Sequence, residues 1–327
     1  MALHQSGALR LVRKACEKDF RILMYHNFPP DLTGLRNHCE HIRRYFNPVS
    51  MSAIAESLTT GRPLPNNAVA ITVDDGYRDF LLYAHPCFRE YDIPTTVFLV
   101  TDFLDGKLWL WWNQIEYAIW QSRQPHIIVD LSGDRRIFPL QTSEEKSYAF
   151  DQLTEALKSL PDPELRIAVR TIIEASGVPM PAHTPEQWKP MEWKEVRRLS
   201  EQNVEFGGHT RTHPILSKVP SLQALRHEIE GCKLRIEEEL THPIIHFCYP
   251  NGRAQDIGAD AIRLTEECGY QTGVTTEWGM NRLDSADAFS LRRLPVTPEV
   301  SPQKFAELLA GSPFAAIRKF VGMRKPI

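Results

Sequence analysis

The repeated alternation of short apolar runs with segments of helical spacing constrains the fold of this chain more than any other feature. Seven apolar runs are typical of buried strands, and they lie at residues 21–28, 68–73, 95–100, 204–206, 244–249, 273–276 and 291–296. Residues 221–240 carry apolar side chains three and four positions apart, which predicts a helix with one buried face and Ser221 as its N-cap. Strands that alternate with helices favour a parallel sheet wrapped by helices.

The number of predicted strands separates two α/β architectures. Seven strands favour a distorted or incomplete (β/α)7 barrel over a doubly wound sheet. No GxGxxG segment follows any of these runs, which argues against a dinucleotide-binding sheet. We therefore predict an α/β chain with a single barrel domain over residues 1–300.

Two segments depart from this alternation. Residues 105–190 contain Trp109, Trp111 and Trp112, then a charged helical stretch and a proline-rich run. We predict a helical insertion that covers one end of the barrel without a core of its own. Residues 301–327 form an amphipathic tail that ends in basic residues. The tail has two interpretations, which are a helix packed on the barrel and a basic segment in peripheral contact with the inner face of a membrane.

Charge and cysteine usage exclude several classes of protein. The net charge of −3 and the lack of a long basic run argue against a nucleic-acid partner. No apolar run approaches the roughly 18 residues that span a bilayer. The six cysteines include no CxxC pair, and no secretory signal is visible, so we expect reduced thiols in a cytoplasmic protein.

Two adjacent carboxylates lie at the end of the second apolar run, in residues 72–76 (TVDDG). Asp74 and Asp75 are costly at the end of a buried strand unless a partner neutralises them. Catalytic groups of barrel enzymes occupy the carboxyl ends of the strands. A simple Asp-Gly turn also accounts for this sequence, so the pair alone does not decide its role.

Two histidines follow the fourth apolar run, in residues 207–214 (GGHTRTHP). His209 and His213 are four residues apart, so both imidazoles can bind one metal ion. The paired glycines allow the backbone to approach a neighbour closely. Two histidines in a polar loop without any ligand remain the alternative.

The two segments reinforce each other. Two histidines and one aspartate form the three-ligand set of a catalytic divalent metal, which leaves one coordination position open. The other aspartate is then available as a general base. Zinc is the usual metal for such a donor set.

In these motifs the chain resembles the polysaccharide deacetylases of carbohydrate esterase family 4, also called the chitooligosaccharide deacetylase homology domain. That family has a TFDDG motif, here TVDDG at 72–76, and an H(S/T)xxH motif, here HTRTH at 209–213. The resemblance covers residues 21–296. It implies that Asp74 is the general base and that Asp75, His209 and His213 bind the metal.

The remaining motifs depart from the family pattern. Residues 247–252 (FCYPNG) are similar to its RxPY motif, with Cys248 in place of the arginine. This variant assigns the oxyanion or substrate contacts to Tyr249 and to the backbone N–H of Asn251. Residues 291–295 (LRRLP) lack the histidine of the family's Leu-x-His motif. Strand alternation points one of two arginines inward, and we predict Arg293 as the charge partner of Asp74.

Two further residues are candidates for the site. His26 ends the first strand in the sequence MYH, which members of the family that act on poly-N-acetylglucosamine share, and it is our candidate for the general acid. A structural role at a strand end is the alternative for His26. Trp278 is a candidate for stacking on a sugar ring, although a core tryptophan is the commoner case.

The two motifs predict a metal-dependent hydrolase, and the resemblance implies that it removes an N-acyl group from an amino sugar. The substrate is then a saccharide, in the form of a polysaccharide, an oligosaccharide or a lipid-linked precursor. A related hydrolase of non-sugar C–N bonds on the same scaffold is one alternative. Another is an inactive saccharide-binding protein that retains the metal, which the missing arginine and histidine keep open.

Overall fold

Seven parallel strands form a ring, which confirms the predicted barrel. The computed structural model describes residues 7–131 and 133–311. Strand pairs follow the order β1, β10, β9, β8, β7, β4, β3, and β1 closes the ring by pairing with β3. The strands are β1 (Arg21–Tyr25), β3 (Ala68–Val73), β4 (Thr95–Leu99), β7 (Val204–Gly208), β8 (His246–Cys248), β9 (Thr272–Trp278) and β10 (Leu291–Pro295).

The strands form where the sequence has continuous apolar runs, because both faces of a parallel barrel strand are covered. All six side chains of β3 are buried. A short strand, β2 (Asn47–Pro48), pairs with the start of β3 outside the ring. The bulge between Leu291 and Arg293 makes the pairing of β10 with β9 irregular.

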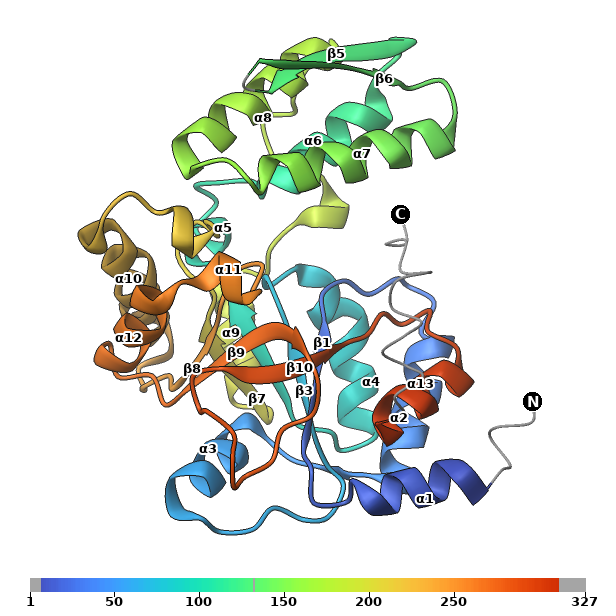
Figure 1. Cartoon of the computed structure of the whole chain (residues 1–327), viewed down its shortest axis with the longest axis vertical. Helices are drawn as coiled ribbons and strands as arrows, with labels where there is room; N and C mark the ends of the chain where they lie inside the picture. The colour runs from blue at the N-terminus through green and yellow to red at the C-terminus, as the bar shows by residue number, and fades with distance from the viewer. Residues whose placement is uncertain (1–6, 132, 312–327) are drawn as a thin grey trace.

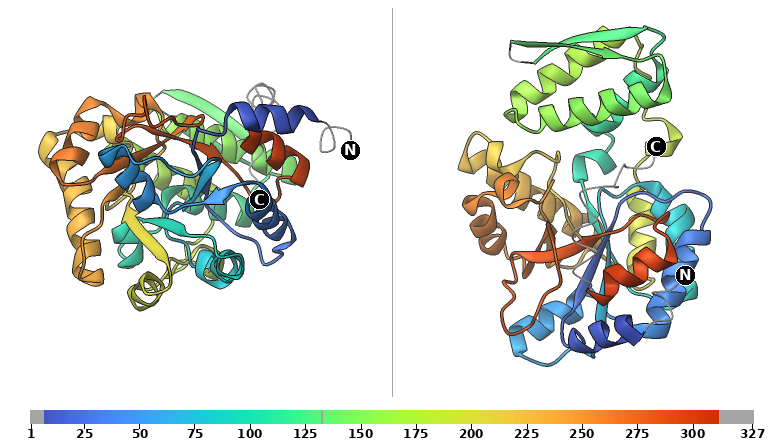
Figure 2. Two further views of the ribbon diagram at one scale, coloured as in Figure 1. Left: turned by 90° about the horizontal axis from the view of Figure 1, so that it is seen from below. Right: turned by 45° about the vertical axis from the view of Figure 1, so that its right-hand side comes forward.

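Helices cover the outside of the ring, as Figures 1 and 2 show. The helix at 222–240 begins at the predicted cap, since the Ser221 hydroxyl accepts a hydrogen bond from the N–H of Ala224. The helices that precede or follow the strands are α1 (Gly7–Ala15), α2 (Thr33–Tyr45), α3 (Met51–Thr60), α4 (His85–Glu90), α5 (Thr101–Leu104), α9 (Trp193–Ser200), α10 (Leu222–Leu240), α11 (Ala254–Ile257), α12 (Ala259–Glu267) and α13 (Pro302–Ala310). No helix among the described residues has the length and apolar character needed to cross a membrane.

The insertion forms a compact lobe above the end of the barrel where α5 and α11 follow their strands (Figure 1). It consists of α6 (Trp111–Gln121), β5 (His126–Leu131), β6 (Asp134–Pro139), α7 (Ser143–Leu157) and α8 (Asp162–Ser176). Its buried side chains, which include Ile119, Phe138, Leu153 and Ile172, form a cluster distinct from the barrel core. Our expectation that this segment lacks its own core is therefore wrong, because its five elements together bury one cluster of apolar side chains.

The first part of the predicted tail packs on the barrel. Phe305 and Leu309 of α13 are fully buried, and α13 contacts α1 and α2. Arg21 donates from Nε to the carbonyl of Leu309 at 2.9 Å. Residues 312–327, which carry the basic side chains of the predicted membrane contact, lie outside the described residues.

Candidate metal and catalytic centre

Asp74 and Asp75 follow β3 directly and enter one buried site. Their exposed fractions are 2% and 3%. Asp74 is held to β1, since its N–H donates to the carbonyl of Tyr25 at 3.0 Å. Asp75 has a φ of 73°, in the left-handed region that a non-glycine residue rarely adopts. Such strain persists only where the surrounding structure imposes it, and it clusters at functional sites.

Asp75, His209 and His213 form a cluster that could hold a metal ion. Oδ1 of Asp75 lies 3.5 Å from Nε2 of His209 and 3.7 Å from Nε2 of His213. The three candidate ligand atoms all lie within 4.8 Å of one another. Nδ1 of His209 lies 2.7 Å from the carbonyl oxygen of Cys248. Donation of the Nδ1 proton to that carbonyl leaves Nε2 free as a ligand, which is the usual outer-shell arrangement of a metal-binding histidine.

The charges of this donor set fit a cation. Burial and the neighbouring His209 lower the pKa of His213 to about 3, so this imidazole is neutral, as a metal ligand must be. Burial opposes the charge of Asp75, but contacts with His209 and His213 outweigh it and lower the pKa of Asp75. The buried carboxylate thus needs one positive charge beside it, which a proton on His209 or a divalent cation can supply.

The glycine pair before His209 serves close packing. A Cβ atom on Gly207 would lie 2.6 Å from the carbonyl oxygen of His246 and 2.7 Å from the ring of Phe98. Only glycine therefore lets β7 lie this close to β8 and β4. This close packing fixes the end of β7, directly before the loop that carries His209 and His213.

Arg293 binds the second carboxylate. Its Nη1 and Nη2 donate to Oδ1 and Oδ2 of Asp74 at 2.7 and 2.8 Å, and the guanidinium is fully buried. Burial alone would raise the pKa of Asp74, but the charge and hydrogen bonds of Arg293 lower it well below its usual range. The structure thus brings together the predicted pair on β10 and β3. Arg292, the other candidate, is exposed.

Three more groups hold the guanidinium in place. Nε donates to the carbonyl of Thr275 at 2.8 Å, and Nη1 donates to Oγ1 of Thr72 at 3.1 Å. Nη2 lies 3.1 Å from Sγ of Cys248, which in turn lies 3.5 Å from Oδ2 of Asp74. Sequence reasoning missed Thr72 and Cys248 as partners. The alternation of side chains along β3 and β8 was the available signal, since both residues point into the barrel.

His26 lies on the open side of Asp74. Its Nε2 is 3.7 Å from Oδ2 of Asp74, and 45% of its side chain is exposed. The imidazole is thus close to the proposed base and in contact with solvent. Its role as general acid remains a prediction.

The structure corrects one predicted residue and leaves two as predictions. The Tyr249 side chain is fully buried in a hydrophobic cluster shared with the outer helices, and it packs on Phe247 with ring centroids 5.2 Å apart. The prediction of a substrate contact for this side chain is therefore wrong, because Cys248 points into the barrel and its neighbour points away. Asn251 follows β8 with a left-handed φ of 57°, and Trp278 is half-buried at the end of β9.

The insertion contributes an aromatic wall that sequence reasoning left ambiguous. The ring of Trp112, at the start of α6, lies edge-on to that of His213, with centroids 4.6 Å apart. Nε1 of Trp112 donates to the Tyr77 hydroxyl at 3.1 Å, and this hydroxyl donates to Oδ1 of Asn113 at 2.5 Å. Trp109 instead packs between Tyr117 and Trp188. Only Trp112 of the three tryptophans thus has a described contact with a candidate metal ligand.

Several solved structures, two of them named as deacetylases, share this architecture. The deacetylase PplD of Streptococcus pyogenes, solved with acetate, superposes with a TM-score of 0.58 at 16% identity, over 89% of this chain and 98% of that chain. IcaB from Ammonifex degensii superposes with a TM-score of 0.57 at 15% identity, over 90% of this chain and 97% of that chain. The BpsB deacetylase domain from Bordetella bronchiseptica superposes with a TM-score of 0.55 at 18% identity, over 86% of this chain and 96% of that chain. At these identities the likeness concerns the fold.

Sequence comparisons carry the relationship further. The poly-beta-1,6-N-acetyl-D-glucosamine N-deacetylase of Escherichia coli (strain K12) is 35% identical over 60 residues, which is 18% of this chain and 9% of that enzyme. The match therefore spans a small part of the curated relative. The family model described as polysaccharide deacetylase matches residues 61–159 and 150–273, which is more than half of the chain. The chain belongs to the polysaccharide deacetylase family.

Proposed function

We propose that this chain is a metal-dependent N-deacetylase that hydrolyses the amide bond between an acetyl group and an amino sugar. The observation that carries the proposal is the division of two adjacent carboxylates between different partners. Asp75 contacts His209 and His213, whereas Asp74 is bound by Arg293. One carboxylate is thus a ligand and the other a base, which is the arrangement that amide hydrolysis needs.

The residues of the chain have separate tasks in this proposal. The pair with Arg293 keeps Asp74 ionised, so Oδ2 can accept a proton from the attacking water. His26, 3.7 Å from that oxygen, can deliver a proton to the leaving amine. The backbone N–H of Asn251 is the proposed donor to the oxyanion. When bound by Asp75, His209 and His213, a divalent cation supplies Lewis-acid chemistry, and zinc suits these donors.

The proposed substrate class is an N-acetylated glucosamine saccharide. The name of the E. coli relative specifies poly-beta-1,6-N-acetyl-D-glucosamine, and Trp278 and Trp112 offer aromatic surface beside the site. Aromatic rings present large apolar faces with fixed geometry, which suits the faces of sugar rings. A lipid-linked precursor that carries the same N-acetyl group would meet the same residues.

The proposal is tested by acetate release from N-acetylglucosamine oligomers with β-1,6 or β-1,4 linkages. The protein is purified, its metal content is measured, and the assay is repeated after chelation and after Zn²⁺ is added back. We expect release that chelation abolishes and zinc restores. Metal uptake and saccharide binding without any acetate would instead establish the inactive binding protein. Acetate release that chelation leaves unchanged would contradict metal dependence.

A further inference from the structure

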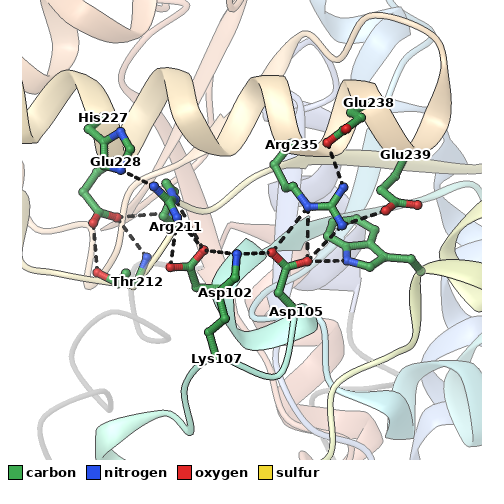
Figure 3. Close-up of polar contacts among 11 residues, drawn as sticks. Asp102, Asp105, Lys107, Arg211, Thr212, His227, Glu228, Arg235, Glu238 and Glu239 are labelled. Carbon is green, nitrogen blue, oxygen red and sulfur yellow. Dashed lines mark hydrogen bonds and ion pairs between the residues drawn. The ribbon is translucent and has the colours of Figure 1, made fainter.

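Glu228, on the outer helix α10, binds the loop between the two metal-ligand histidines. Its Oε2 accepts hydrogen bonds from the backbone N–H groups of Arg211 and Thr212, both at 2.9 Å. Its Oε1 accepts from the Thr212 hydroxyl at 2.9 Å. Figure 3 shows this half-buried carboxylate beside the loop. One side chain thus fixes the middle of a five-residue segment whose two ends are His209 and His213.

The loop needs such support because its backbone is strained. Thr210 and His213 have φ values of 65° and 57°, in the left-handed region. The Thr210 hydroxyl accepts from the N–H of His213 at 3.0 Å, which closes a tight turn. Backbone of this kind relaxes unless its surroundings hold it. A relaxed turn would move the imidazole of His213 relative to that of His209.

The opposite side of the loop is bound to α5. The N–H groups of Thr101 and Asp102 donate to the carbonyls of Thr210 and Arg211 at 3.3 and 2.9 Å. The Arg211 guanidinium also binds the Asp102 carboxylate, with Nη2 at 3.0 Å from Oδ1. The loop therefore lies between α5 and α10. On the side of α10, Glu228 binds the loop backbone and His227 contacts the Arg211 guanidinium.

A second set of ion pairs fixes α10 to the segment after α5. Arg235 donates from Nη2 to Oδ1 of Asp105 at 3.0 Å, and the same nitrogen lies 2.6 Å from Oε1 of Glu239. Lys107 lies between Asp102 of α5 and Asp105 after it, 2.7 Å from Asp105 and 3.7 Å from Asp102 (Figure 3). Charge-assisted bonds of this number restrict the relative movement of the two elements. Glu228 thus acts from a fixed helix.

From this arrangement we infer that Glu228 is a positioning residue of the metal site. It holds residues 210–212 so that both imidazoles face Asp75, and it does not touch the metal or the substrate itself. The inference rests on the proposed function, because it assigns to Glu228 the geometry of the proposed ligands. Outer partners of metal ligands typically change metal affinity by 10–100-fold when they are removed.

The test compares Glu228→Ala and Glu228→Gln with Glu237→Ala in the full chain. Glu237 is a matched control, since it lies on the same helix and also accepts a backbone N–H, from Ile244 at 3.0 Å. Two quantities are measured, which are the Zn²⁺ dissociation constant and amide hydrogen exchange over residues 209–213 in metal-free protein. Thr212→Ala removes one of the three hydrogen bonds that Glu228 accepts from the loop. It replaces Glu228→Ala in the test if that variant does not fold.

We expect Glu228→Ala to weaken Zn²⁺ binding by about 10–100-fold and to accelerate exchange in the loop. Thr212→Ala should change both in the same direction by less. Glutamine retains an acceptor oxygen, so it should restore both quantities to near wild type, and Glu237→Ala should leave both unchanged. Equal values for Glu228→Ala and Glu237→Ala would overturn the inference, as would a glutamine variant as impaired as alanine. A wild-type chain that takes up no divalent metal would instead overturn the proposed function.

Discussion

Arg293 is a fully buried guanidinium, and it binds both carboxylate oxygens of Asp74 at 2.7 and 2.8 Å. Burying two charges is costly, and the mutual attraction of a bidentate pair offsets that cost. The pair therefore adds little net stability of its own. Its value lies in keeping Asp74 ionised inside a site that would otherwise protonate it.

Removing one member of the pair leaves the other charge buried and uncompensated. We predict that Arg293→Ala lowers the free energy of unfolding by about 3–5 kcal/mol and abolishes acetate release. Arg293→Lys keeps a positive charge beside Asp74, so its free energy of unfolding should fall by less than that of Arg293→Ala. Arg292→Ala is the matched control, since that neighbour is exposed. Urea denaturation measures the difference, and equal stability of the two alanine variants would contradict this account of the pair.

The sequence predicted these residues to different degrees. The convergence of Asp74, Asp75, His209 and His213 followed from their places at strand ends. Alternation along one strand pointed one of its two arginines inward, and Arg293 was the one predicted. The prediction for Tyr249 was wrong because side chains alternate along its strand, and Cys248 occupies the inward-facing position. The contact of Glu228 with the loop could not be predicted from the sequence, because Glu228 lies 16 residues from Thr212. The pattern of its helix indicates one buried apolar face and nothing about the loop.

At the scale of elements, two histidines of α2, His38 and His41, pack their rings against Phe305 of α13. His38 lies fully buried on α2 and stacks on Phe305 of α13, with ring centroids 3.9 Å apart. Its Nδ1 lies 3.1 Å from the Tyr25 hydroxyl, and its Nε2 lies 2.8 Å from the carbonyl oxygen of Val300. Both ring nitrogens are thus engaged inside the core.

This contact makes stability depend on pH. Burial lowers the pKa of His38 to about 4, against about 6.5 in an unfolded chain. The unfolded chain therefore binds more protons in this range, so the stabilisation is present above pH 6.5 and is lost as the pH falls toward 4. Between pH 7 and pH 5 this loss is about 2 kcal/mol.

We predict that His38→Gln removes this part of the pH dependence. Urea denaturation at the two pH values gives the free energy of unfolding of both proteins. The wild type should lose about 2 kcal/mol more than the variant on going from pH 7 to pH 5. Other buried histidines, such as His246, contribute to both proteins alike. Equal losses would show that His38 is not buried in its neutral form.

Element prediction was most successful where a continuous apolar run marked a barrel strand. The predicted runs at 68–73 and 291–296 correspond to β3 and β10 almost residue for residue. The hairpin of β5 and β6 was not predicted, because β6 exposes all but one of its side chains and therefore lacks an apolar run. Strand β2 contains two residues, which is too short for any periodicity to appear.

At the scale of the whole molecule, the described residues form two hydrophobic clusters in the barrel and a separate core in the inserted lobe. The lobe reaches the site through α6, where Trp112 lies against His213. A second contact comes from α8, where Nη2 of Arg166 donates to the Thr212 hydroxyl at 3.2 Å. The lobe can therefore shape substrate access without supplying any of the proposed metal ligands.

We predict that damage to the lobe core stays within the lobe. Leu153 is fully buried there, and Leu153→Ala should cost about 2–5 kcal/mol of local stability. Amide hydrogen exchange should accelerate across residues 111–176, while Zn²⁺ binding stays within a few-fold of wild type. Leu23→Ala, in the barrel core, is the contrasting variant and should affect exchange near the metal site. A uniform loss of protection in both variants would mean that the two cores unfold together.

The central claim is that Asp75 binds the metal while Asp74 acts as the base. Asp74→Asn tests it most directly, because asparagine keeps the size of the side chain and removes its ability to accept the proton. Metal content and acetate release from N-acetylglucosamine oligomers are measured on the same sample of each protein. We predict that the variant retains the wild-type metal content and loses acetate release by about 10²–10⁴-fold, the usual contribution of a general base. Acetate release at the wild-type rate by a metal-loaded Asp74→Asn protein would contradict the account.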